Sequence, residues 1–240
     1  MTEWIRTVLA EKLADLTSPQ AVDAFEDVLN AAERNYLGGL LAPEEELGPM
    51  VKAFGGTLYY NLAQLRHAYC LSAMDRLTRP LDLIRVGWRH LRAPSIIRRH
   101  HATTDACVRR LTGIDPARLS DFEVWSVIDQ WFGEAPKYME AVLLFRNGLV
   151  IDAFPFDRFT PSAEWRERVL TDVARSLDAL RDWQLALADR FVERGWLRRR
   201  GDFFLLQLRE IAPIVNGEAS AANLRAIVKD RCAEQERARA

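Results

Sequence analysis

Apolar residues recur at helical spacing along nearly the whole chain, and this feature restricts the fold more than any other. The clearest case lies between Ser162 and Gly195, where six apolar residues follow one another in steps of three, four or seven. Such steps place them on one face of a long amphipathic helix. We therefore expect a mainly α fold, an irregular multi-helix domain with one or two very short extended segments. The six residues are Val169, Val173, Leu177, Leu180, Leu187 and Phe191.

Helix-capping residues and glycine or proline breaks set the expected element boundaries. Ser18, Asn61 and Ser120 each precede an apolar run and can cap a helix. Asn147-Gly148 predicts a break, and an aromatic, proline-rich loop follows it at 154–161. The expected extended segments are 57–61 and 202–206. The expected helices are Glu3–Ala14, Pro19 to Gly38-Gly39, Pro43–Phe54, Leu62–Leu77, Leu81–Leu91, Pro94–Leu111, Asp121–Phe132, Ala135–Phe145, Ser162–Gly195, Gln207–Ile211 and Ala219–Arg237.

Length and composition indicate a domain that folds without disulfides or a metal. The 240 residues are 49% hydrophobic, which supplies a core for a single domain over 1–240, with a possible subdivision near 147–161. Cys70, Cys107 and Cys232 are an odd number and far apart, which is typical of reduced thiols. The sequence contains neither a membrane-spanning apolar run nor a secretory signal, and we expect a cytoplasmic protein without membrane contact.

Charge is unevenly distributed although the formal net charge is −1. Residues 1–52 hold ten acidic and four basic residues, whereas residues 75–110 hold nine arginines against three aspartates. A helical interaction protein could use the basic stretch 76–110 to bind nucleic acid or an acidic partner. We favour the alternative that these arginines face the acidic N-terminal helices or solvent, because Trp88 alone among them does not make the spaced set of aromatic residues that base stacking requires.

The sequence contains no local catalytic or phosphate-binding motif. GxxxxGK[ST], GxGxxG, HExxH and GxSxG are all missing. His100 and His101 are adjacent on a predicted helix, so their side chains should diverge by about 100° and cannot coordinate one metal ion together. We expect no metal and no cofactor bound by this chain. An enzyme assembled from residues far apart in the sequence stays open, because spacing alone does not reveal such a site.

Aromatic residues are frequent, with seven tryptophans and five tyrosines. Most of them can be explained by core packing. The alternative is a largely apolar pocket between helices for a hydrophobic or aromatic small molecule.

Two segments resemble the central helical region of phosphoenolpyruvate-synthase-like and pyruvate-phosphate-dikinase-like phosphotransferases, nearest to the rifampicin phosphotransferase type. One is Phe54-Gly55-Gly56-Thr57-Leu58-Tyr59-Tyr60-Asn61-Leu62, a glycine-aromatic-Asn-Leu element. The other begins at Glu193-Arg194-Gly195-Trp196-Leu197 and continues through 202–206, 210–211, 217–218 and 224–236. No motif of the family is found over 80–160.

The resemblance implies a non-catalytic substrate-binding or scaffolding module, split or truncated from the catalytic domains. In the family an ATP-grasp domain precedes this region and a phosphohistidine domain follows it, and this chain has neither. ATP and Mg would therefore be bound only by such domains on separate chains, and no catalytic residue is carried over. The candidate substrate-binding residues, chosen by proximity to the matched element, are Tyr36, Met50, Phe54, Tyr59, Tyr60 and Gln64.

Overall fold

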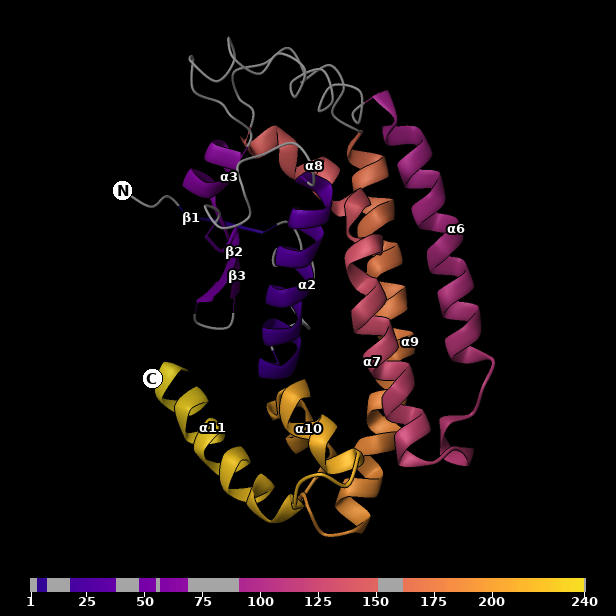
Figure 1. The fold of residues 1–240 in the computed structure, drawn as a ribbon, viewed down its shortest axis with the longest axis vertical. Coiled ribbons are helices and arrows are strands. Elements are labelled where there is room, and N and C mark those ends of the chain that lie inside the picture. The colour runs from indigo at the N-terminus through magenta and orange to yellow at the C-terminus, as the bar shows by residue number, and fades with distance from the viewer. Residues whose placement is uncertain are drawn as a thin grey trace.

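The computed structural model describes residues 4–7, 18–37, 48–54, 57–68, 91–150 and 162–239. These residues form a mainly α fold, as predicted, together with one small sheet (Figure 1). The helices are α2 (Pro19–Leu37), α3 (Leu62–Ala68), α6 (Ala93–Thr112), α7 (Asp121–Tyr138), α8 (Glu140–Val150), α9 (Ala163–Glu193), α10 (Leu208–Val215) and α11 (Leu224–Arg239); the strands are β1 (Trp4–Arg6), β2 (Val51–Phe54) and β3 (Thr57–Asn61); the 3₁₀ turns are η3 (Pro116–Arg118), η5 (Arg200–Leu205) and η6 (Ala221–Asn223).

The long helix α9 forms the spine of the molecule, with α6 and α7 packed along it (Figure 1). Its start is capped by Ser162, whose hydroxyl accepts from the backbone N–H of Trp165. Five of the six residues of the predicted apolar face are buried, and Leu177 is half-buried. The helix ends where Gly195 adopts a positive φ of 71°, a conformation that glycine adopts without steric cost. The prediction for 162–195 is confirmed.

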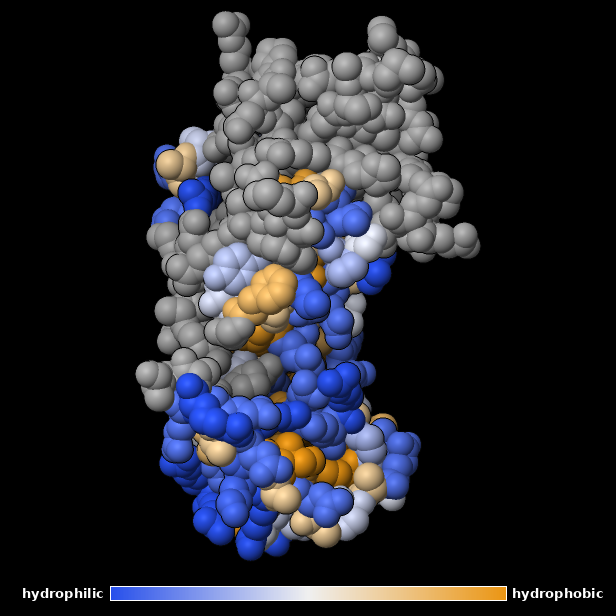
Figure 2. Space-filling view, turned by 90° about the vertical axis from the view of Figure 1, so that its left-hand side faces the viewer, coloured by the Kyte–Doolittle hydropathy of each residue, from blue (hydrophilic) through white to orange (hydrophobic). Residues whose placement is uncertain are grey.

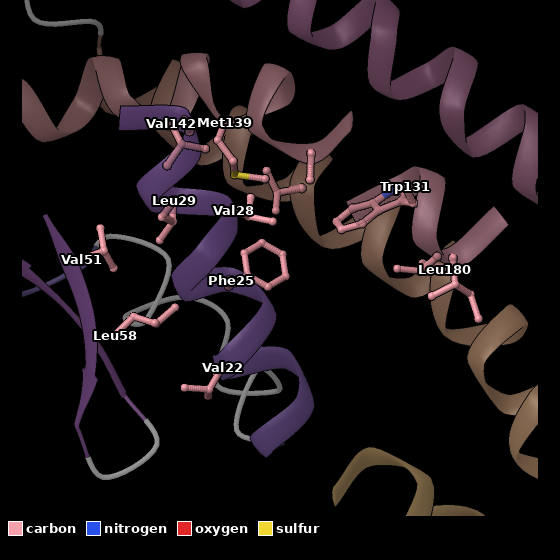
Figure 3. Packing of buried hydrophobic residues seen from close by; sticks show 14 of the residues in the cluster. Val22, Phe25, Val28, Leu29, Val51, Leu58, Trp131, Met139, Val142 and Leu180 are labelled. Atoms are coloured by element: carbon pink, nitrogen blue, oxygen red, sulfur yellow. The ribbon is translucent and has the colours of Figure 1, made fainter. Parts of the chain in front are cut away.

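Helix α2 lies between the sheet and the long helices (Figure 3). Val22 and Leu29 are on its buried surface with Val51 and Leu58 of the sheet nearby. Phe25 is fully buried and contacts Trp131 of α7 edge to face, with ring centroids 6.2 Å apart. Since aromatic pairs of this geometry add to the free energy gained by burial, α2 joins the two halves of one core.

The sheet is antiparallel with the order β1-β3-β2. Strand β3 was predicted, and Asn61 at its end caps α3 by accepting from the N–H of Gln64 at 3.2 Å. The predicted helices Glu3–Ala14 and Pro43–Phe54 are wrong where the structure describes them, because 4–6 and 51–54 are strands. Pairing of both segments with β3 supplies hydrogen bonds between elements that local helical spacing does not reveal.

Three further boundaries differ from the prediction. Helix α7 continues through Pro136 to Tyr138, so the interruption falls at Met139 instead of near residue 133. Asn147-Gly148 lies inside α8, because one glycine costs a helix only about 1 kcal/mol and buried residues 141–145 hold the helix in place. Segment 202–206 is largely the 3₁₀ turn η5 instead of extended.

Several predicted features lie outside the described residues: the stop at Gly38-Gly39, the helical segments over 69–90, and the loop 154–161. Among the described helices, none combines the length and apolarity required to span a bilayer. Figure 2 shows the face that carries the sheet; hydrophilic residues dominate its lower end, where Figure 1 places α10 and α11.

Candidate functional site: a histidine pair beside a cavity

His100 and His101 both approach Asp172 of α9. The Nε2 atom of His100 lies 4.0 Å from the Asp172 Oδ2 atom, and Nδ1 of His101 contacts the same oxygen. The two rings are 6.0 Å apart between centroids and inclined by 61°. The rings diverge along α6 as expected, but α9 packs closely enough to place one carboxylate between them. Within the described ranges, no group of three or more His, Cys, Asp or Glu side chains has the arrangement of a metal site.

The interruption between α7 and α8 determines the position of His100. Since the helical ladder stops at Met139, the carbonyl of Tyr138 is open to an outside donor, and Nδ1 of His100 lies 3.0 Å from it. A carbonyl only accepts, so Nδ1 carries the proton. Burial lowers the pKa of His100 below its usual 6.5; Asp172 and the Tyr138 carbonyl oppose this effect without overcoming it. His100 is therefore a neutral, 5% exposed ring at pH 7.

Asp172 is the centre of a polar chain between α6 and α9. The carboxylate is 5% exposed. Its Oδ1 atom accepts from Arg175 at 3.3 Å, and Arg175 also donates to Asp105 of α6 at 3.1 Å. With His101 on Oδ2, the buried charge has partners on both helices, as a buried carboxylate requires.

A cavity of about 670 Å³ lies beside His100, where α2, α6, α7 and α8 meet. Its apolar lining includes Ile96, Pro136 and Ala141, and Asn35 and Thr103 add polar groups. Ligand-binding pockets usually measure about 300–1,000 Å³ and combine apolar walls with a few polar groups. The other lining residues that the structure describes are Ala32, Arg99, His100, Glu134, Lys137, Tyr138 and Glu140.

The acidic side chains of the cavity already have partners. Glu134 accepts from the Tyr138 hydroxyl and from Gln130, each at 2.9 Å, and Arg110 lies 3.6 Å away. The hydrogen bond from Gln130 lowers the pKa of Glu134 most, burial opposes it to a smaller extent, and the hydrogen bond from Tyr138 and the positive charge of Arg110 lower the pKa further. Burial, then Glu134, raises the pKa of Tyr138 to about 12. Tyr138 is thus a neutral donor committed to Glu134.

The arrangement is suited to holding a molecule. The His100 Nδ1 atom is used by the Tyr138 carbonyl, and the Tyr138 hydroxyl is used by Glu134. Thr103 directs its hydroxyl at the Arg99 carbonyl, 2.7 Å away. A nucleophile needs a base within hydrogen-bonding reach, and these three groups are instead fixed by bonds that shape the wall.

The six candidate substrate-binding residues lie around the sheet and the neighbouring helices α2 and α3. Met50 and Tyr60 are buried in the core. Phe54 is exposed and packs against Tyr59, with ring centroids 5.9 Å apart. Gln64 is half-buried beside Gly48. The side chain of Tyr36 lies outside what the structure describes. None of the five side chains that the structure describes lines the cavity beside His100, and the role of all six in binding stays a prediction.

The basic stretch 76–110 is described from residue 91 onward. Arg99 pairs with Glu140 of α8 and Arg110 with Glu134 of α7. These partners are acidic residues of later helices, whereas acidic N-terminal helices were among the expected ones. Binding of nucleic acid by this stretch remains a hypothesis.

Sequence reasoning missed the polar chain around Asp172 and the cavity beside it. His101 and Asp172 are 71 residues apart, and no spacing rule connects residues at that separation. One available signal was a lone aspartate beside the apolar face of a long helix, next to Val173.

Comparisons of the chain with protein-family models, curated proteins and solved structures found no match.

Proposed function

We propose that this chain is a small-molecule-binding helical module and that its ligand occupies the cavity beside His100. The observation that supports the proposal is the cavity of about 670 Å³, whose polar groups are held in place by hydrogen bonds to one another. Such fixed polar groups reduce the entropy lost on binding and give a ligand one preferred orientation.

The chemistry of the lining defines the ligand. Ile96, Pro136 and Ala141 offer apolar contact to a flat body. Asn35, which is exposed on α2, offers amide hydrogen bonds at the rim. The two acidic lining residues are paired with cations, and the ring of His100 is neutral. We infer a largely apolar, aromatic molecule with hydrogen-bonding substituents.

The resemblance to the rifampicin phosphotransferase type extends this proposal. If the chain corresponds to the central region of such enzymes, its ligand is the acceptor substrate of a phosphoryl transfer. ATP and Mg then bind to an ATP-grasp domain on a separate chain, and a separate phosphohistidine domain carries the phosphate to the acceptor. The module itself contributes only binding and orientation, which can account for several kcal/mol of a barrier.

Thermal unfolding with a panel of aromatic polyketides tests the binding. A ligand at about 100 times its Kd stabilises the folded state by about 2.7 kcal/mol. For a chain of this size that corresponds to a rise in Tm of roughly 5–10 °C. The proposal fails if no compound of the panel raises the Tm.

A pair of threonines on α6 supplies matched variants for this test. Thr103 and Thr112 each donate to the carbonyl four residues earlier, at 2.7 and 2.9 Å, but only Thr103 lines the cavity. Thr103→Phe should obstruct the cavity and abolish the shift in Tm, whereas Thr112→Phe should keep it. Equal shifts in both variants would place the ligand elsewhere.

A further inference from the structure

A second cavity, of about 570 Å³, lies at the other end of the molecule between η5 and α11. Four cationic side chains line it, Arg198 and Arg199 beside η5 and Arg225 and Lys229 on α11. Leu197 and Val228, both buried, form an apolar floor. It shares no lining residue with the cavity beside His100.

Two arginine side chains of this cavity, those of Arg199 and Arg225, are held in place by neighbouring groups. Asp202 is 4% exposed and accepts from Nε of Arg199 at 2.8 Å and from the backbone N–H groups of Arg198 and Arg199 at 3.3 Å. Arg225 donates to the carbonyl of Gly195, in the turn that ends α9. This carbonyl fixes the guanidinium without cancelling its charge.

The lining has an excess of positive charge. Its acidic members are Asp202 and Glu236, against four cations. Asp202 is already used by Arg199. A doubly charged anion would therefore balance the cavity, and arginine forks suit phosphate oxygens in particular.

We infer that this cavity binds a small organic phosphate, with the phosphate among the four cations and an apolar stem on Leu197 and Val228. Nucleic acid is a poorer fit, because the part of the lining that the structure describes contains no aromatic side chain on which a base would stack. The inference is independent of the proposed function, since it concerns a different site with a different ligand chemistry.

Cys232 provides a direct measurement, because its half-buried thiol lies in the wall of this cavity and within reach of Arg199. We expect phenyl phosphate to slow alkylation of Cys232 by iodoacetamide, followed by mass spectrometry. At about ten times its Kd, phenyl phosphate leaves roughly a tenth of the sites open and slows alkylation about tenfold. Buried Cys107 of α6 is the internal reference and should not respond.

Three further additions separate the sources of any protection. Inorganic phosphate should protect Cys232 more weakly than phenyl phosphate, because it lacks the apolar stem. Benzyl alcohol and sodium chloride of matched ionic strength should give no protection. Protection by benzyl alcohol equal to that by phenyl phosphate, or no protection by either phosphate, would overturn the inference.

Two variants of α11 test the role of the cations. Lys229→Gln should weaken phenyl phosphate binding about tenfold, since it removes one charged hydrogen-bond donor. Arg237→Gln, an equal change of charge outside the cavity lining, should leave binding unchanged. If both variants weaken binding equally, phenyl phosphate is attracted by the overall positive charge of α11 and does not bind in this cavity.

Discussion

At the scale of single residues, Asp172 is the position where the structure departs most from what the sequence suggests. It lies in α9 next to the apolar face and is nearly inaccessible to solvent, yet its carboxylate receives His101 and Arg175 and lies 4.0 Å from His100. A buried charge of this kind is tolerated only while its partners remain.

Asp172→Asn should destabilise the fold. The amide keeps the volume but loses the charge that His101 and Arg175 face, and charged hydrogen bonds contribute about 1.5–3 kcal/mol each. We expect a decrease of about 2–4 kcal/mol in the free energy of unfolding, measured with urea. Asp178→Asn, on the exposed face of the same helix, should change it by less than about 0.5 kcal/mol. Equal effects of the two substitutions would contradict the role of Asp172.

His100 should make stability dependent on pH. Its folded-state pKa is lowered by burial. At a pH between the two pKa values, the unfolded chain therefore binds a proton that the folded chain does not bind. The contribution of neutral His100 to the free energy of unfolding is complete above pH 6.5. It is lost as pH falls from 6.5 towards the folded-state pKa, by at most about 1.4 kcal/mol per pH unit.

Urea unfolding at pH 7.5, 6.5 and 5.5 measures this dependence. His100→Asn is the informative variant, because an amide N–H can still donate to the Tyr138 carbonyl but does not titrate. The variant should be less stable at pH 7.5 and should lose less stability on acidification. A slope unchanged by the substitution would assign the pH dependence to other groups.

At the scale of elements, the sequence predicts helices better than strands. The α9 helix follows from six apolar residues, and Ser120 correctly marks the start of α7 with a capping box to Glu123. Strands β1 and β2 are three and four residues long, too short to show a period of two. Their conformation is determined by pairing with β3, which is information that no local window contains.

The contact between α6 and α9 offers an element-scale prediction. Trp183 of α9 is 1% exposed and donates its indole N–H to the carbonyl of Leu111 at 3.0 Å. Trp183→Phe removes the donor and part of the ring, which leaves a buried carbonyl with one partner fewer. We expect a loss of about 2–3 kcal/mol in the free energy of unfolding. Trp165→Phe, at a half-buried position of the same helix, should lower the free energy of unfolding clearly less. An equal decrease would argue against a stabilising hydrogen bond from Trp183 to the Leu111 carbonyl.

At the scale of the whole molecule, α2 connects the sheet to the helices. On one side Phe25 packs against Trp131 of α7. On the other, the side-chain oxygen of Asn30 accepts from the N–H groups of Met50 and Val51 at 3.0 Å, and its amide donates to the Val51 carbonyl at 2.9 Å. Glu26 accepts from the N–H of Ala53 at 2.7 Å. The sequence predicted α2 itself, but gave no sign that Asn30 would bind the backbone of a strand about twenty residues later.

Asn30→Ala should therefore loosen the sheet without unfolding the helical part. Three bonds between α2 and the segment 50–51 are lost, and loss of even about 2 kcal/mol of local stability raises amide exchange roughly 30-fold. We expect the amides of β2 and β3 to exchange faster by that factor, measured by hydrogen exchange and mass spectrometry, while those of α6, α7 and α9 keep their protection. Asn35→Ala, at an exposed position of the same helix, is the control and should leave both regions unchanged. If exchange rises equally in the sheet and in α9, the sheet and the helices unfold as one unit. That result would contradict the expectation that the sheet can open while the helical part stays folded.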